Sequence, residues 1–150
     1  MSMIWKPHVT VAAIIEKDGK FLLVEEETAE GVLFNQPAGH LENGETLLAG
    51  VAREAWEETA YRFTPTALLG VYHWKHPMKN ELTYLRFAFV GDITGHDPEK
   101  KLDTGILRAV WMTPDEIHDT QDRHRSPQVW QCLQHYLAGQ RFPLSVLTHM

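Results

Sequence analysis

Runs of apolar and β-branched residues separated by polar turns recur along the chain. Each run has the length and composition of a β-strand. They cover residues 9–15, 21–24, 68–74, 82–90 and 106–112. Asp18-Gly19, between the first two runs, is a strong signal for a two-residue hairpin turn. We therefore expect a β-sheet at the centre of the protein, opening with a hairpin.

Helical patterns occupy three other segments. Residues 46–59 are good helix formers, and their apolar side chains recur on one face. Thr113 followed by Pro114 and Glu116 has the sequence of a capping box, so a short helix should follow the fifth strand. A third helix is expected to begin at Ser126-Pro127 and to stop at Gly139. Strands with interspersed helices indicate the α/β class.

Composition narrows the class of protein further. A chain of 150 residues with no repeat and no linker supports one core, so residues 1–150 are interpreted as a single domain. The formal net charge of -6 argues against general affinity for nucleic acid or for an anionic membrane. The single cysteine, Cys132, cannot form a disulfide within the chain and fits a reducing compartment. Without an apolar run of about 20 residues or a signal-peptide pattern, we expect a soluble cytoplasmic protein; the sequence leaves its oligomeric state open.

Three glutamates are the first sign of chemistry. Glu54, Glu57 and Glu58 have the spacing that places side chains on one face of the predicted helix. Carboxylates this close repel one another unless a cation lies between them, and hard divalent ions such as Mg²⁺ or Mn²⁺ take oxygen ligands. A solvated acidic face with Arg53 as its nearby base is the alternative interpretation.

The residues around these glutamates favour the metal. Gly39, Glu45, Arg53-Glu54 and Glu57-Glu58 follow the order Gly-x5-Glu-x7-Arg-Glu-x2-Glu-Glu. The segment 39–61, which contains these residues, resembles the Nudix box, the signature of the Nudix hydrolases. The resemblance implies an α/β/α sandwich around a mixed sheet. It also implies metal-dependent hydrolysis of a diphosphate linked to another group.

The resemblance also assigns roles within the box. It implies that Glu57 and Glu58 are metal ligands, that Glu54 is a further ligand or the base that orients the attacking water, and that Gly39 offers its carbonyl to a metal. Arg53 and Glu45 are expected to pair. One position departs from the family pattern, because Ala60 stands where a glycine would suit a left-handed end of the helix. The alanine either bears strain or ends the helix differently.

Residues outside the box extend the resemblance to bacterial phosphatases of the family. The matching segments are HVTVA at 8–12, NQPAGHLE at 35–42, YHW at 72–74, LRF at 85–87, RSP at 125–127 and GQRFPL at 139–144. The resemblance implies a phosphatase of nucleoside tri- and diphosphates and of thiamine pyrophosphate-like compounds, including hydroxymethylpyrimidine pyrophosphate. The alternatives are a pyrophosphohydrolase that releases a nucleoside monophosphate from a triphosphate or dinucleotide, and a module that senses a nucleotide without cleaving it.

Candidate substrate-binding residues are less specific than the box. Arg86 is a polar residue inside a predicted strand, and Arg125 precedes a helix start, where a guanidinium can meet a phosphate. His40 directly follows Gly39. Trp74, with Tyr72, can stack on a heterocycle or belong to the core. Asp103 is a further acidic candidate in a polar loop.

Overall fold

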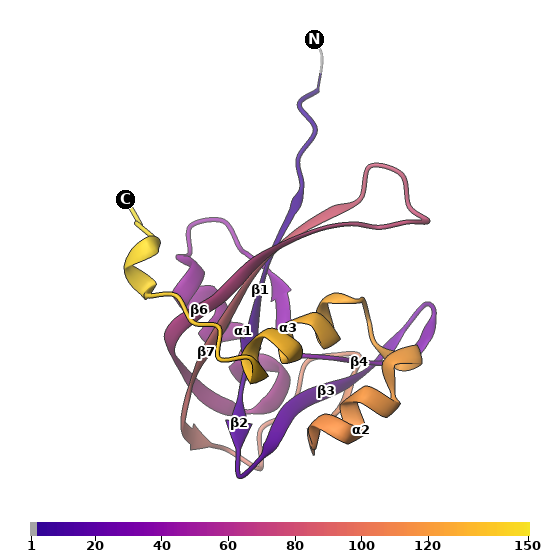
Figure 1. Cartoon of the computed structure of the whole chain (residues 1–150), viewed down its shortest axis with the longest axis vertical. Helices are drawn as coiled ribbons and strands as arrows, with labels where there is room; N and C mark the ends of the chain where they lie inside the picture. Colours follow the sequence, from indigo (N-terminus) through magenta and orange to yellow (C-terminus); the bar gives the residue numbers. More distant parts are fainter. Residues whose placement is uncertain (1–2) are drawn as a thin grey trace.

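The computed structural model describes residues 3–150 and contains two four-stranded sheets (Figure 1). The first sheet has the order β5-β1-β7-β6, with β1 parallel to β7 and the other pairs antiparallel. Its strands are β5 (Ala38–His40), β1 (His8–Ile14), β7 (Thr83–His96) and β6 (Tyr61–Lys75). The second sheet is antiparallel and contains β2 (Glu16–Lys17), β3 (Lys20–Thr28), β4 (Gly31–Asn35) and β8 (Ile106–Met112).

Helices lie on both sides of the mixed sheet (Figure 1). They are α1 (Leu47–Thr59), α2 (Pro114–Asp119) and α3 (Gln128–Leu137), with two 3₁₀ turns, η1 (Gln121–Arg123) and η2 (Leu144–Val146). The described part of the chain has no helix with the length and apolar character needed to cross a membrane.

The alternation of side chains along β1 builds two separate cores. Ala12 and Ile14 pack in the core that contains Cys132 and Leu133 of α3, whereas Val11 and Ala13 pack in the core that contains α1. Successive strand residues point to opposite faces of a sheet, so one apolar strand can serve both layers. This arrangement confirms the α/β class and the helix-sheet-helix layering expected from the sequence.

The predicted opening hairpin is only partly correct. Asp18 and Gly19 form the expected turn with positive φ angles of 51° and 79°. However, the hairpin joins β3 to the two-residue β2, while β1 pairs with β5 and β7 in the other sheet. Because β1 is buried on both faces, it lies inside the mixed sheet between β5 and β7, and sequence proximity does not reveal these partners.

The helix ends follow the predicted signals closely. Thr46 caps α1 by accepting a hydrogen bond from the Ala49 backbone N–H at 3.1 Å, and the helix ends at Thr59. Ala60 has φ 61° and ψ 20°, so it takes the left-handed conformation that the family pattern assigns to glycine. The α2 capping box between Thr113 and Glu116 is present. The Ser126 hydroxyl accepts the Gln128 backbone N–H at 3.2 Å, so the start of α3 is within two residues of its prediction.

Candidate active site

A cavity of about 980 Å³ opens beside β5 and the acidic face of α1. Its lining contains all of the candidate residues proposed from the sequence except Tyr72. These are Gly39, His40, Glu54, Glu57, Glu58, Trp74, Arg86, Asp103 and Arg125. Residues from distant parts of the chain therefore meet in one place, and their carboxyl groups are close enough to influence one another.

Gly39 and Glu54 lie in direct contact. A Cβ atom added to Gly39 would overlap the Glu54 carboxylate, so only glycine fits at this position of β5. Glu54 is only 8% exposed, and this burial raises the pKa of its carboxyl group. The close approach explains in physical terms why this part of the motif needs glycine.

Glu58 is the most perturbed carboxyl group of the cavity. Its Oε1 accepts a hydrogen bond from the Ala38 backbone N–H at 2.9 Å, which fixes the end of α1 against β5. Burial raises the pKa of Glu58 to about 9, and the nearby Glu54, Glu26 and Asp103 carboxylates contribute to the rise. The arrangement crowds carboxyl groups into a poorly solvated place, where a cation would favour their charged form.

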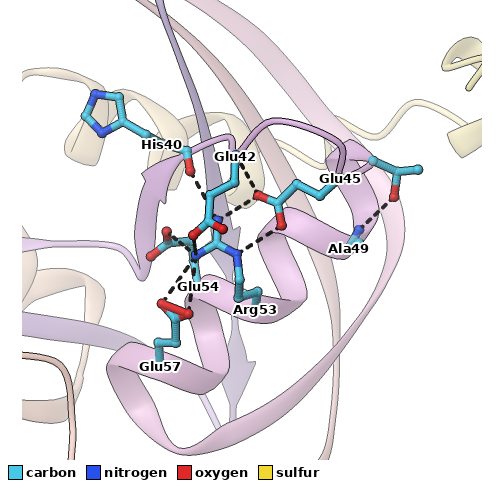
Figure 2. Close-up of polar contacts among 8 residues, drawn as sticks. His40, Glu42, Glu45, Ala49, Arg53, Glu54 and Glu57 are labelled. Carbon is cyan, nitrogen blue, oxygen red and sulfur yellow. Dashed lines mark hydrogen bonds and ion pairs between the residues drawn. The ribbon is translucent and has the colours of Figure 1, made fainter.

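Arg53 lies at the centre of this acidic group (Figure 2). Its Nε donates to Glu45 at 2.9 Å and its Nη2 donates to the same carboxylate at 2.7 Å, which confirms the predicted pair. Its Nη1 lies 2.8 Å from Glu54, 3.2 Å from Glu57 and 3.3 Å from Glu42. Bidentate pairing with Glu45 thus holds a positive charge between the carboxylates.

The acidic side chains are not already arranged as a closed metal site. Within residues 3–150, no three His, Cys, Asp or Glu side chains surround a common point at metal-ligand spacing. Arg53 Nη1 instead contacts two of the box glutamates. The donor chemistry nevertheless fits a hard divalent ion, because the groups gathered here are carboxylates and the Glu54 carboxylate lies directly against the bare Cα of Gly39.

Arg86 forms the floor of the cavity. It is only 3% exposed, and its guanidinium donates to Asn35 Oδ1 and to Gln36 Oε1, each at 2.8 Å. Its Nη1 also lies 3.6 Å from Cys132 Sγ of α3. Among the described residues Arg86 has no carboxylate partner, so a positive charge is held rigidly by neutral groups. Such a charge can meet an anionic or polar ligand.

The rim of the cavity contains the other candidates. Arg125 Nη1 pairs with Glu26 at 2.8 Å. His40 Nε2 lies 3.0 Å from His8 Nδ1, and burial lowers the pKa of His40. The Trp74 and Tyr84 rings stack with centroids 5.9 Å apart and planes 17° apart.

Tyr72 was expected as a possible stacking partner beside Trp74, and the structure does not support this. Its hydroxyl hydrogen-bonds His135 Nδ1 at 2.7 Å, and its ring packs against the core beneath α3. Tyr72 is therefore a structural residue behind the cavity.

Several lining residues were missed by sequence reasoning. Glu26 is one of three consecutive glutamates that look like a solvated face, yet it lies beside Glu58. Asn35 of the lining was noted only as part of a motif, as was Gln36, which lies outside the lining but also accepts a hydrogen bond from Arg86. Gln128 lies near the start of α3, where the sequence signal concerned the helix cap alone. The only signal in the sequence for these residues was that two of them, Asn35 and Gln36, stand shortly before Gly39 of the Nudix box.

Comparison with known proteins agrees with this geometry. A NUDIX domain family model matches residues 6–131. The chain therefore belongs to the Nudix family of hydrolases, which act on phosphoanhydrides of small molecules and generally depend on a divalent metal ion.

Individual relatives narrow the position within the family. The chain is 40% identical over 143 residues to Phosphatase NudJ of Escherichia coli strain K12, a match that covers 95% of this chain and 92% of the relative. A solved NUDIX hydrolase from Nitrosomonas europaea is 51% identical and has a TM-score of 0.93, with 97% of this chain and 98% of that chain covered. A MutT protein from Methanosarcina mazei Go1 has a TM-score of 0.71 at 22% identity, covers 93% of this chain and 99% of its own, and shows the fold alone.

Proposed function

We propose that this Nudix hydrolase is a Mg²⁺- or Mn²⁺-dependent phosphatase that removes the terminal phosphate from nucleoside tri- and diphosphates and from thiamine pyrophosphate-like compounds, including hydroxymethylpyrimidine pyrophosphate. The observation that carries the proposal is that one cavity is lined by four neighbouring carboxyl groups and by the buried Arg86; the carboxyl groups are those of Glu54, Glu57, Glu58 and Asp103. The 40% sequence identity to a protein named Phosphatase NudJ supports a phosphatase reaction.

We assign the box residues the following roles. Glu57 and Glu58 are the metal ligands, Gly39 offers its backbone carbonyl, and Glu54 is either a further ligand or the base that accepts a proton from the attacking water. A bound divalent ion neutralises charge on the phosphate oxygens and lowers the pKa of a coordinated water. Arg53 then stays anchored by Glu45 and keeps Glu54 and Glu57 in position.

We assign substrate binding to four other lining residues, Arg125, Arg86, His40 and Trp74. Arg125 lies on the rim with its side chain 44% exposed, so its guanidinium can exchange Glu26 for a phosphate oxygen. We expect Arg125→Ala to lower kcat/KM by about 10-fold or more while the melting temperature changes little, because the lost group forms a charged hydrogen bond to substrate.

Product analysis tests the proposal directly. The purified full chain is incubated with ATP or thiamine pyrophosphate and Mg²⁺, with an EDTA control, and the products are separated by ion-exchange chromatography. We expect orthophosphate plus ADP from the triphosphate and orthophosphate plus thiamine monophosphate from the diphosphate. Early pyrophosphate from ATP, before any ADP accumulates, would instead identify a pyrophosphohydrolase, and binding without turnover would identify a sensor.

A further inference from the structure

Arg86 keeps an unused donor at the surface of the cavity. A guanidinium carries five N–H groups, and the hydrogen bonds that Arg86 makes to the protein use only Nη1 and Nη2. Its Nε has no partner among the described residues. In the same part of the chain, the only buried side-chain nitrogen or oxygen without a partner belongs to Gln128. Arg86 Nε is therefore accessible, and the space that Arg86 lines is the cavity.

Asn35 adds a second donor whose orientation is settled by its partner. Arg86 Nη2 lies 2.8 Å from one end of the Asn35 amide, and because a guanidinium can only donate, this end is the oxygen. The Nδ2 end is then a donor that Arg86 does not use. It has no partner within residues 3–150 and is accessible for the same reason as Arg86 Nε, and Asn35 also lines the cavity.

The positive charge of Arg86 is held in place without a counter-charge. Gln36 fixes the guanidinium, because its Oε1 accepts from Nη1 and its Nε2 donates to the Val129 carbonyl, each at 2.8 Å. No carboxylate of the described residues lies within ion-pair distance of Arg86. A buried charge with neutral partners is stabilised by an anion, and phosphate is the anion of a phosphoanhydride substrate.

The place of Arg86 in the sheet indicates which phosphate it meets. Glu54 and Glu58 contact β5, and β1 separates β5 from β7. Neighbouring strands are about 4.8 Å apart, so the Arg86 backbone is roughly 10 Å from β5. Tyr84, whose ring stacks on Trp74, precedes Arg86 by two residues on the same face of β7. A phosphate at Arg86 is thus beside the aromatic side chains, where the organic group of a substrate can stack.

We infer that Arg86 Nε and Asn35 Nδ2 bind the phosphate that stays with the organic group of the substrate. The inference rests on the proposed function in taking the terminal phosphate to be the one removed. When water attacks the terminal phosphorus, its bond to the bridging oxygen breaks, and this oxygen leaves with the retained phosphate and an extra negative charge. Donors and a fixed positive charge at the retained phosphate stabilise that departing group.

Asn35→Asp tests this role with almost no change of shape. The aspartate keeps an oxygen for Arg86 Nη2, so a purely structural role of Asn35 would be preserved. It removes the Nδ2 donor, however, and gives Arg86 a carboxylate partner. Asn80→Asp adds the same charge at an exposed position outside the cavity lining and is the matched control. Thermal melting shows whether both variants fold.

The binding test uses isothermal titration calorimetry with AMP and with adenosine in EDTA, where no divalent ion can hold a phosphate. We expect the wild type to bind AMP about 10-fold or more tightly than adenosine, Asn35→Asp to lose this difference and Asn80→Asp to keep it. Equal binding of AMP and adenosine by the wild type would overturn the inference, even if Asn35→Asp failed to fold. Wild-type affinity for AMP in a folded Asn35→Asp protein would also overturn it.

Product inhibition identifies the phosphate concerned and separates this inference from the proposed function. With ADP as substrate and Mg²⁺, Asn35→Asp should raise the inhibition constant of AMP by about 10-fold or more and leave that of orthophosphate unchanged. An equal rise for both products would show that the two donors hold the transferred phosphate and would overturn the inference. Tighter binding of AMP in EDTA that Asn35→Asp abolishes would support a phosphate site at Arg86 even if ADP released no orthophosphate, which would refute the phosphatase assignment alone.

Discussion

Replacing Glu57 with Gln should inactivate the enzyme without unfolding it. The structure supplies a matched control, because Glu42 and Glu57 contact the same atom, Arg53 Nη1, at 3.3 and 3.2 Å. Their side chains are 63% and 32% exposed, and Arg53 keeps Glu45 and Glu54 in either variant. Ion pairs this exposed contribute little, so each substitution should change the free energy of unfolding by less than about 1 kcal/mol.

The effect on turnover should differ sharply between the two variants. Loss of a metal ligand removes charge stabilisation of the transition state, so Glu57→Gln should lower kcat by roughly 10²–10⁴-fold. At about 1.36 kcal/mol for each factor of ten, this range corresponds to about 3–5 kcal/mol of activation free energy. Glu42→Gln removes a similar contact with Arg53 but no proposed ligand, and its kcat should stay within a few-fold of wild type.

Orthophosphate release at saturating substrate and Mg²⁺, together with thermal melting of all three proteins, measures both quantities. Near-normal turnover by a folded Glu57→Gln protein would refute the ligand assignment. An equal loss of activity in Glu42→Gln would show that the arginine network, rather than a metal ligand, determines the rate.

Three further changes test other parts of the structure. Ala60→Gly should raise the free energy of unfolding by up to about 1 kcal/mol, because glycine takes positive φ without steric cost; a lower melting temperature would mean that burial of the alanine methyl group is the larger effect. Gly39→Ala should lower kcat by about 10²-fold, because the added methyl group displaces the Glu54 carboxylate; a folded variant with wild-type turnover would contradict this. Two arginines lower the pKa of Glu25, so the stability it contributes is present above the ordinary carboxyl pKa and is lost as the pH falls through the lowered value. Glu25→Gln should therefore be roughly 1 kcal/mol less stable than wild type near pH 7, with the difference disappearing well below about pH 4 in denaturant titrations.

Local signals in the sequence predicted the helices well. The capping box at Thr113 and the stop at Gly139 act within a single turn of chain, so their effect does not depend on the rest of the fold. The short strands β4 and β5 were not predicted, because three to five residues carry too little periodicity. The pairing of β1 with β7 depends on burial of both faces, which a local pattern cannot specify.

The residues of the candidate site also differ in whether a local sequence pattern could predict them. One helix brings Glu54, Glu57 and Glu58 together, so their spacing in the sequence was sufficient to predict that they lie on one face. Arg86 was recognisable as a polar residue in a strand. The burial of Gln128 in the cavity lining depends on how α3 packs against the sheet, and no local pattern distinguishes it from the exposed Gln131 on the same helix.

The alternation of β1 between the two cores has a consequence for how the protein unfolds. Because Ala12 and Val11 are adjacent in sequence but belong to opposite cores, separating β1 from its neighbours exposes both apolar layers to water at once. Neither helical layer can then melt as an independent cooperative unit. The amide hydrogens of β1 and β7 should accordingly exchange with solvent only through global opening, at the slowest rates in the molecule.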